Sequence, residues 1–324
     1  MSVNTHDRVP RTTASGAADA GDAARPRRGR RRINERAWAA AFLAPALIAI
    51  VSMRIAPTVQ AFTSSLYRGF PGGLLEPVFT GFSNYQDLWA NEGFRQTVLR
   101  TLVFNLVINP LQIALALLIA IVMTRKIHLR GPLRTLVFVP ATVPIVGSSI
   151  VWGIALQPRG PVNAIIEALG GRGQPFFTSP DQALGSIILV ASWIGIGYWM
   201  LFLIAGIHAI PEEYYEAAKL DRAGPVRTFF SVTIPLLKRP LLFVLVADTV
   251  ANFVLFVPVQ IVTGGGPQNS TTMQMFNAYR TTYTYGSKNL GAAEVVILTL
   301  IMLVFVAIQF RLLREERAPR RKRP

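Results

Sequence analysis

The stretch PEEYYEAAKLDRAGPVRTFFSVTIP, residues 211–235, is the longest polar segment between two strongly apolar runs of this chain. We expect a helix to begin here. Pro211 suits the first helical position, where a missing N–H costs nothing. Glu212 and Glu213 then fall in the first turn, where the helix dipole favours negative charge.

The rest of this stretch predicts a turn and a second short helix. Tyr214, Ala217 and Ala218 recur at helical spacing, which predicts a small apolar face on the first helix. Residues 223–225, Ala-Gly-Pro, are expected to end that helix and start another, because Gly tolerates positive φ and Pro fits a new first position. Residues 229–232 supply the apolar face of the second helix.

The stretch resembles the EAA loop of the permease subunits of binding-protein-dependent ABC importers. The matching residues are Glu216, Ala217, Ala218, Asp221, Ala223, Gly224, Ile234 and Pro235. The resemblance is greatest to the carbohydrate-uptake branch, which includes glycerol-phosphate permeases. It implies that residues 211–235 form a cytoplasmic coupling helix, which docks in a cleft of an ATPase subunit.

The resemblance also implies which residues couple to the ATPase. They are Tyr214, Tyr215, Glu216, Ala217, Ala218, Asp221, Gly224, Phe229 and Pro235. Glu216 would make a charged contact, although it could instead be a solvated carboxylate on a helix surface. A helix pair this short cannot bury its own aromatic side chains, including Phe230, so a protein partner is expected. Arg222 stands where the family usually has Gly, so we expect Gly224 to carry the turn.

Composition indicates a membrane protein. The 324 residues are 51% hydrophobic and only 15% charged, whereas soluble domains carry about 25% charged residues. The net charge of +16 could suggest a nucleic-acid partner. The placement of the basic residues argues against such a partner, since 25 of the 33 Lys and Arg residues fall on one side of the predicted membrane spans. This bias is the positive-inside pattern, with both termini cytoplasmic.

Six apolar runs are long enough to cross a bilayer, which takes about 20 residues each. They are residues 38–60, 97–124, 133–156, 184–207, 236–262 and 292–313. Pro140 and Pro144 predict a kinked third span. Gly185, Gly195, Gly197 and Gly206 allow close helix contact in the fourth span. We therefore expect an all-α polytopic membrane protein with six transmembrane helices, and the resemblance implies the type I ABC importer permease fold.

The predicted organisation has four parts. Residues 1–36 form a disordered basic cytoplasmic tail, and residues 37–96 hold the first transmembrane helix and an extracytoplasmic loop. Residues 97–313 form the permease core with the loop 211–235, and residues 314–324 form a basic cytoplasmic tail. A short interfacial helix is also expected between Val162 and Leu169.

No catalytic motif is present. The chain has no cysteine and three scattered histidines, so neither thiol chemistry nor a metal site is expected. The run Thr-Gly-Gly-Gly-Pro at 263–267 lacks the Lys-Ser/Thr of a phosphate-binding loop, and it too resembles the sugar-permease branch. We expect no enzymatic activity and no cofactor bound by this chain, with ATP used by a partner ATPase.

Polar residues inside spans are candidates for the substrate path, because polar groups at bilayer depth are costly and often functional. Asp248, Asn252 and Phe256 recur every four residues in the fifth span, which puts them on one helix face. Asn105 and Asn109, with Gln112, share a face of the second span. The alternative is that these groups bridge helices or pack on a partner subunit.

We therefore expect a permease subunit of an ATP-driven importer in the bacterial inner membrane, moving a sugar or a polyol phosphate. Its partners would be ABC ATPase subunits, a second similar permease, an extracytoplasmic binding protein and the lipid bilayer, with no nucleic acid. No basic residue lies well inside the second to sixth spans, which favours a neutral sugar. Two alternatives are a self-sufficient secondary transporter, for which no internal repeat is visible, and a membrane scaffold.

Overall fold

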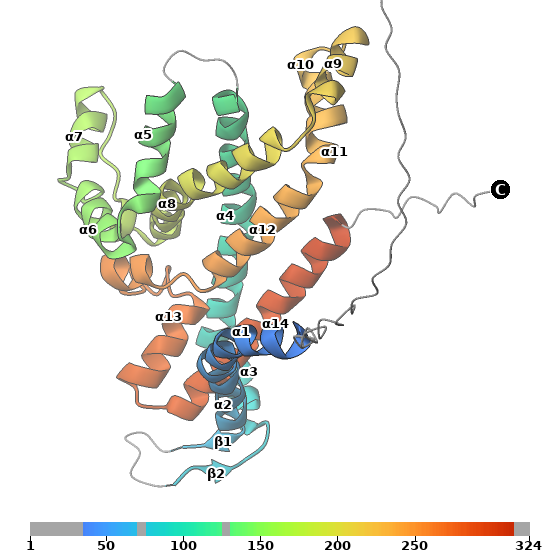
Figure 1. The fold of residues 1–324 in the computed structure, drawn as a ribbon. Coiled ribbons are helices and arrows are strands. Elements are labelled where there is room, and N and C mark those ends of the chain that lie inside the picture. The colour runs from blue at the N-terminus through green and yellow to red at the C-terminus, as the bar shows by residue number, and fades with distance from the viewer. Residues whose placement is uncertain (1–34, 70–75, 125–129, 314–324) are drawn as a thin grey trace, which may run out of the picture. The chain divides into compact units, whose positions relative to one another are not determined.

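The computed structural model describes residues 35–69, 76–124 and 130–313, and this part is almost entirely helical (Figure 1). The chain divides into two units, one ending at Arg54 and the other beginning at Ile55. The predicted tails, residues 1–36 and 314–324, lie outside the described residues, except that the first helix already begins at Glu35.

In the first unit, the described residues form α1 (Glu35–Ile50) and most of η1 (Val51–Ile55), a π-helical turn. With α2 (Ala56–Ser65) they make one helical stretch from Trp38 to Ser65 that is long and apolar enough to cross a membrane. Its apolar side chains are exposed, as expected of a helix that lipid covers. The first predicted span is therefore confirmed by length and composition, and the helix runs five residues past its predicted end.

The remaining elements all belong to the second unit. In chain order they are β1 (Tyr67–Arg68), β2 (Val78–Phe79), α3 (Ser83–Ala90), α4 (Glu92–Thr124), α5 (Arg130–Thr142), α6 (Ile145–Ala155), α7 (Pro161–Ala168), η3 (Phe176–Thr178), α8 (Pro180–His208), α9 (Glu212–Leu220), α10 (Pro225–Thr228), η4 (Phe229–Thr233), α11 (Ile234–Leu236), α12 (Lys238–Phe253), η5 (Val259–Thr263), α13 (Gln274–Tyr279), η6 (Arg280–Thr284) and α14 (Lys288–Leu313). The two strands pair antiparallel, with Tyr67 opposite Phe79. Helix α7 confirms the short helix predicted near Val162.

Three single helices, α4, α8 and α14, are long and apolar enough to span a bilayer. They confirm the predicted second, fourth and sixth spans, and each begins a few residues earlier than predicted. The early starts are polar turns that continue the helix beyond the apolar run. At α8, for example, Pro180 occupies an N-terminal position and the Ser179 side chain accepts a hydrogen bond from the Asp181 N–H.

The third predicted span is broken rather than merely kinked. Helices α5 and α6 meet at an angle of 99° across residues 143–144. Pro144 is the residue before α6 and disfavours helical geometry at Val143, which separates the two helices. Pro140, by contrast, lies inside α5 without ending it.

The fifth predicted span, 236–262, is wrong at its C-terminal end. Helix α12 stops at Phe253, because Pro258 has no N–H to bond the carbonyl of Val254 and its ring would clash there. At the other end, the segment 225–236 meets α12 at 71°. Pro240 accounts for this bend in the same way, since it leaves the carbonyl of Leu236 without its helical donor. The described residues thus include four helices long and apolar enough to span a bilayer, or up to six if each bent pair is one span.

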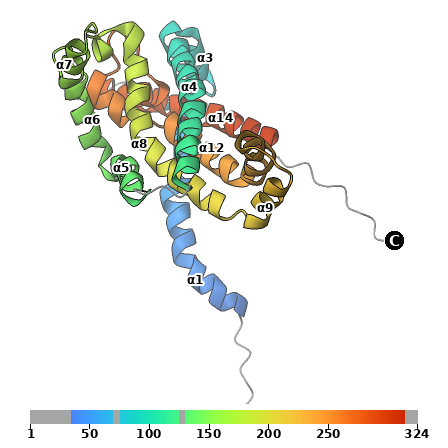
Figure 2. The same cartoon turned by 90° about the horizontal axis from the view of Figure 1, so that it is seen from above.

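The core of the second unit lies where α4, α8 and α12 pack together (Figure 2). Apolar side chains such as Ala120, Met200 and Val244 are fully buried there. Of the four glycines predicted to allow close contact, Gly195, Gly197 and Gly206 lie against neighbouring helices, whereas Gly185 meets no atom within 4 Å, so the prediction is wrong there. A Cβ on Gly197 would lie 2.2 Å from the Val137 carbonyl oxygen of α5, and one on Gly206 would meet Pro240 of α12.

Candidate functional site

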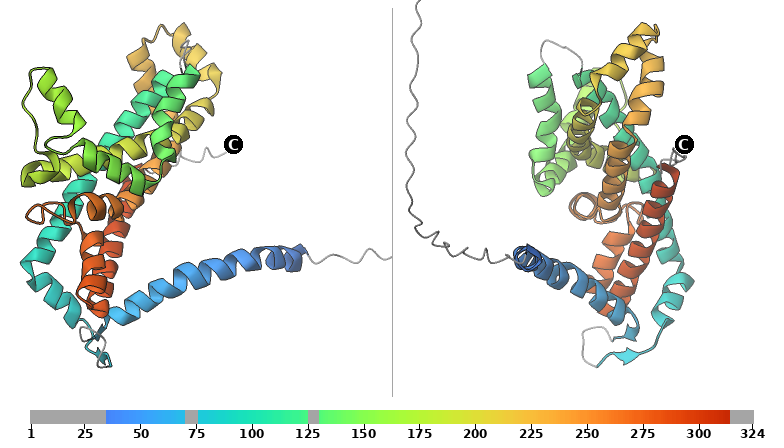
Figure 3. Two further views of the ribbon diagram at one scale, coloured as in Figure 1. Left: turned by 90° about the vertical axis from the view of Figure 1, so that its left-hand side faces the viewer. Right: turned by 45° about the vertical axis from the view of Figure 1, so that its right-hand side comes forward.

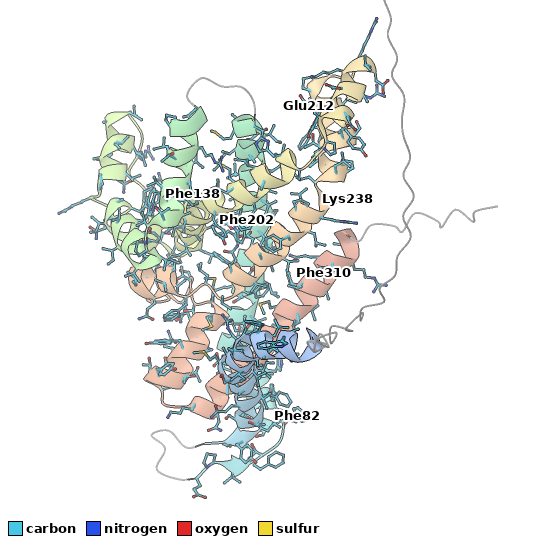
Figure 4. All side chains as sticks on the ribbon, in the orientation of Figure 1. Phe82, Phe138, Phe202, Glu212, Lys238 and Phe310 are labelled. Atoms are coloured by element: carbon cyan, nitrogen blue, oxygen red, sulfur yellow. The ribbon has the colours of Figure 1, made fainter. Side chains whose placement is uncertain are left out.

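The segment 211–235 folds as two helical pieces, as predicted, at the end of α12 away from the strands β1 and β2 (Figure 1). Pro211 is extended, with φ −58° and ψ 137°, and stands one residue before α9, so it is not the first helical residue. The second piece runs without a gap through α10, η4 and α11. Glu212, at the start of α9, and Lys238, at the start of α12, are labelled in Figure 4.

Arg222 forms the turn between the two pieces, and the expectation that Gly224 would carry it is wrong. Arg222 has φ +52°, in the left-handed region. The N–H of Ala223 donates to the Ala218 carbonyl at 2.9 Å, and the N–H of Arg222 donates to the Lys219 carbonyl at 3.0 Å. This pattern is a Schellman motif with Arg222 in the position that Gly usually takes. Gly224 has φ −65° and precedes α10.

The inner face of the segment differs from the predicted one. Tyr215 packs against the core cluster of α4, α8 and α12, and its hydroxyl lies 3.3 Å from the Thr233 Oγ1. Ala218, three residues later, is buried on the same face. Tyr214 and Ala217, which were expected beside Ala218, are exposed instead.

The outer face is apolar and charged together. Phe230 is 66% exposed, and its ring packs edge-on against Phe229 with ring centroids 4.8 Å apart. Leu220 and Val226 are still more exposed. Glu216, Asp221 and Pro235 also lie on the surface, so of the predicted coupling residues only Tyr215 and Ala218 point inward, with Phe229 half-buried.

The candidate substrate-path residues form a buried polar cluster that joins four helices. The amide nitrogen of Asn252 lies 2.8 Å from the Asn109 Oδ1, 3.1 Å from the Gln112 Oε1 and 3.1 Å from the Asp248 Oδ1. The Trp199 indole of α8 donates to the same Asp248 oxygen at 2.6 Å. Asp248 is only 1% exposed, so in this conformation the cluster is buried between the helices.

Two other candidates lie apart from this cluster. Phe256 follows the end of α12 and is therefore not on the face of Asp248 and Asn252. Its ring instead packs against Phe276 and Tyr279. Asn105 is buried in α4 and donates to the carbonyl of Thr101 in its own helix.

Several members of the buried cluster, and a separate group around Glu294, were not predicted from the sequence. Thr249 accepts hydrogen bonds from the amides of Asn109 and Gln309, and so ties α14 to α4 and α12. Glu294 of α14 is 1% exposed and accepts from Asn277 and Thr281. Glu294 could have been found from the sequence, because it lies near the start of the sixth apolar run and a carboxylate inside a membrane span is costly, the argument that singled out Asp248.

Two cavities are notable, and both lie away from the segment 211–235. One, of about 350 Å³, is lined by α3, α4, η6 and α14. The other, of about 470 Å³, lies between the end of α6 and the loop that follows η5. Within the described ranges, no group of three or more His, Asp or Glu side chains is arranged to hold a metal ion.

The comparisons identify the family. Residues 112–317, more than half of the chain, match the binding-protein-dependent transport system inner membrane components. The chain belongs to this family. It is a multi-pass membrane permease, of a family of transport proteins rather than of enzymes.

Similar curated permeases extend the match over most of the chain. The chain is 32% identical to the lactose transport system permease protein LacF of Rhizobium radiobacter, over 85% of this chain and 94% of the relative. It is 31% identical to the sn-glycerol-3-phosphate transport system permease protein UgpA of Agrobacterium fabrum, over 83% and 92%. For the sulfoquinovosyl glycerol transport system permease protein SmoG of Agrobacterium fabrum, the identity is 28%, over 87% and 92%. These matches do not favour a self-sufficient secondary transporter.

A solved structure has the same fold as this permease. It is the crystal structure of a bacterial alginate ABC transporter in complex with an alginate pentasaccharide-bound periplasmic protein. The TM-score is 0.74 at 19% identity, over 86% of this chain and 95% of the other. The permease therefore has the all-α fold of ABC importer permeases.

Proposed function

We propose that this permease is the membrane subunit of an ATP-driven importer for a sugar or a polyol phosphate. An extracytoplasmic binding protein delivers the solute, a second similar permease completes the pore, and two ATPase subunits drive transport. The names of the relatives support this class of solute, since they refer to lactose, sn-glycerol-3-phosphate and sulfoquinovosyl glycerol transport.

The proposal that residues 211–235 couple to the ATPase rests on the exposed outer face of this segment. This face exposes apolar side chains, Phe230 and Val226 among them, as well as the carboxylates of Glu212, Glu213 and Glu216. An aromatic and aliphatic surface rimmed by charge is typical of a protein contact. The inward Tyr215 ties this face to the core, so a movement of the ATPase would be transmitted to α4, α8 and α12.

In this proposal the segment 211–235 and both termini face the cytoplasm, where the basic residues concentrate. The strands, α3 and the 350 Å³ cavity then lie toward the extracytoplasmic side. ATP-driven closure of the ATPase subunits pulls on the segment and opens the spans outward, and hydrolysis resets them. The buried cluster of Asp248, Asn252 and Asn109 would meet the solute only after these helices separate.

Co-purification from the native membrane tests the proposed assembly. The tagged chain is solubilised in a mild detergent, and the co-purifying proteins are identified by mass spectrometry. We expect an ABC ATPase and a second permease. Glu216→Arg and Phe230→Ser should both lose the ATPase but keep the second permease.

The matched control is Glu167→Arg on α7, which reverses the charge of another exposed helical carboxylate outside the segment. It should keep both partners. Recovery of this chain alone, in the unmodified form and in every variant, would contradict the proposal and favour a transporter that works by itself.

A further inference from the structure

The cavity of about 350 Å³ at the end of the bundle away from residues 211–235 is polar and built from distant parts of the chain. Its lining includes Arg100 of α4, Arg280 of η6 and Glu294 of α14. Figure 3 shows α13 and α14 side by side at this end of the second unit. A cavity of this volume is at the lower limit of the roughly 300–1,000 Å³ typical of small-molecule sites.

Two guanidinium groups line this cavity without a carboxylate partner. No carboxylate oxygen lies within 4.0 Å of either Arg100 or Arg280 in the described residues. Arg100 donates to the Gln96 Oε1 at 2.9 Å. Arg280 has a buried Nε that bonds to no described group. Burying a donor without a partner is costly, so the unmet donor of Arg280 indicates a missing acceptor.

Glu294 offsets only part of the positive charge of the pair. Its two carboxylate oxygens already accept hydrogen bonds from the Asn277 Nδ2 at 2.8 Å and from the Thr281 Oγ1 at 2.7 Å. It is the single carboxylate in the lining, against two guanidinium groups, so the cavity keeps a positive excess.

Arg280 is also held in a fixed position. Its guanidinium carbon lies 5.7 Å from the ring centroid of Phe276 and 5.5 Å from that of Tyr285. Stacking on two rings restrains a long side chain, and a restrained guanidinium is well suited to bind a planar or tetrahedral anion. The ordering cost of such a contact is therefore already met in the free protein.

The rest of the lining is rich in amide groups suited to hydroxyls. Gln268 and Asn269 lie at the exposed edge of the cavity, both with positive φ, of 48° and 58°. The Thr272 side chain donates to the carbonyl of Gly265, which secures the base of their loop. Amide side chains both donate and accept hydrogen bonds, as hydroxyl groups do.

We infer that this cavity binds a hydroxylated solute that carries an anionic group, such as a phosphate, sulfonate or carboxylate. Arg280 and Arg100 hold the anion, and the amides at the edge contact the hydroxyls. This inference rests on the proposed import function and narrows its solute class. It also revises the expectation of a neutral sugar, because Arg100, near the start of the second apolar run, and Arg280, between the fifth and sixth runs, converge at this cavity.

The test measures binding to the purified permease complex in a polyoxyethylene detergent, which contains neither sugar nor phosphate. Isothermal titration uses glycerol 3-phosphate, glucose 6-phosphate and glucuronate, with glycerol and glucose as neutral counterparts. We expect at least one anionic probe to bind, and to bind more tightly than its neutral counterpart. Arg280→Gln should weaken that binding by roughly tenfold, since it removes a charge-assisted contact. Arg95→Gln, an exposed arginine of α4 outside the lining, should leave it unchanged.

Glu294→Gln is a second variant, and the tighter binding expected of it cannot come from misfolding. It removes the single negative charge of the lining and should tighten binding of the anionic probe. The inference is overturned if no anionic probe binds, if neutral probes bind as tightly, or if Arg280→Gln has no effect. Added phosphatidylglycerol that displaces the probe completely would assign the site to lipid headgroups and also overturn it. Co-purification of the ATPase is measured separately, so failure here leaves the proposed assembly standing.

Discussion

The indole Nε1 of Trp199 lies 2.6 Å from the Oδ1 of Asp248 and so joins α8 to α12 inside the bundle. The other carboxylate oxygen of Asp248 has no hydrogen-bond partner, and no ion pair forms with it in the described residues. A buried charge without a counter-ion is costly. Asp248 therefore stabilises this conformation as a hydrogen-bond acceptor rather than as a charge.

Replacing this carboxylate by an amide tests that role. Asp248→Asn keeps an acceptor for Trp199 and removes the charge, so we expect an equal or higher melting temperature in detergent. Asp248→Leu removes the acceptor and leaves the Trp199 and Asn252 donors unpaired, which should cost about 1–3 kcal/mol. Asp181→Asn, at an exposed position of α8, serves as the control. A loss from Asp248→Asn as large as that from Asp248→Leu would show that the charge itself is required.

The contact between α5 and α8 depends on a missing side chain. A Cβ on Gly197 would lie 2.2 Å from the Val137 carbonyl oxygen and 3.1 Å from the Phe138 Cα, and neither backbone atom can move without shifting α5. Gly197→Ala should therefore lower stability by about 1–3 kcal/mol. Gly185→Ala in the same helix meets no atom within 4 Å and should be neutral or slightly stabilising. Thermal melts of the two variants decide this, and equal effects would refute the close contact.

The turn at Arg222 gives a second matched pair. Arg222→Gly relieves a left-handed conformation that costs a non-glycine residue about 1 kcal/mol, so it should stabilise the end of α9. Gly224→Ala should have little effect, because Gly224 has negative φ and open space around its Cα. Hydrogen exchange of the Ala223 amide, which bonds to Ala218, reports the change. Slower exchange in Arg222→Gly is expected. Faster exchange in Gly224→Ala would instead show that Gly224 forms the turn.

The absence of cysteine allows the orientation to be measured with single introduced thiols. Val78→Cys on β2 and Phe230→Cys in η4 both replace exposed side chains at opposite ends of the second unit. An impermeant maleimide should label Val78→Cys in intact spheroplasts, and Phe230→Cys only after lysis. The reverse pattern would place residues 211–235 outside the cytoplasm.

The sequence was sufficient for the helical class and for most spans, because long apolar runs leave few alternatives in a bilayer. The breaks were harder to foresee, since Pro140 continues a helix whereas Pro144 ends one, and only packing distinguishes them. The two-helix form of residues 211–235 was predicted from the sequence, but the residue on its inner face was shifted by one, from Tyr214 to Tyr215. Helical spacing alone does not say which of two adjacent aromatic residues meets the core.

The buried polar groups were likewise only partly predictable from the sequence. The spacing of Asp248 and Asn252 correctly placed both on one face, and α12 ends before Phe256 could join them. Their partners on other helices, such as Trp199 and Gln309, depend on tertiary contacts that no local pattern specifies. The cavity of Arg100, Arg280 and Glu294 was missed for that reason as well.

The proposed contact between residues 211–235 and an ATPase is tested most directly by photo-crosslinking in native membranes. Phe230→Cys and Val78→Cys are each labelled with a maleimide-benzophenone reagent, irradiated, and analysed by mass spectrometry. We predict an adduct with an ABC ATPase from Phe230→Cys and none from Val78→Cys. An ATPase adduct from Val78→Cys, or its absence from Phe230→Cys while the labelled chain remains in the assembled complex, would contradict the coupling role of this segment.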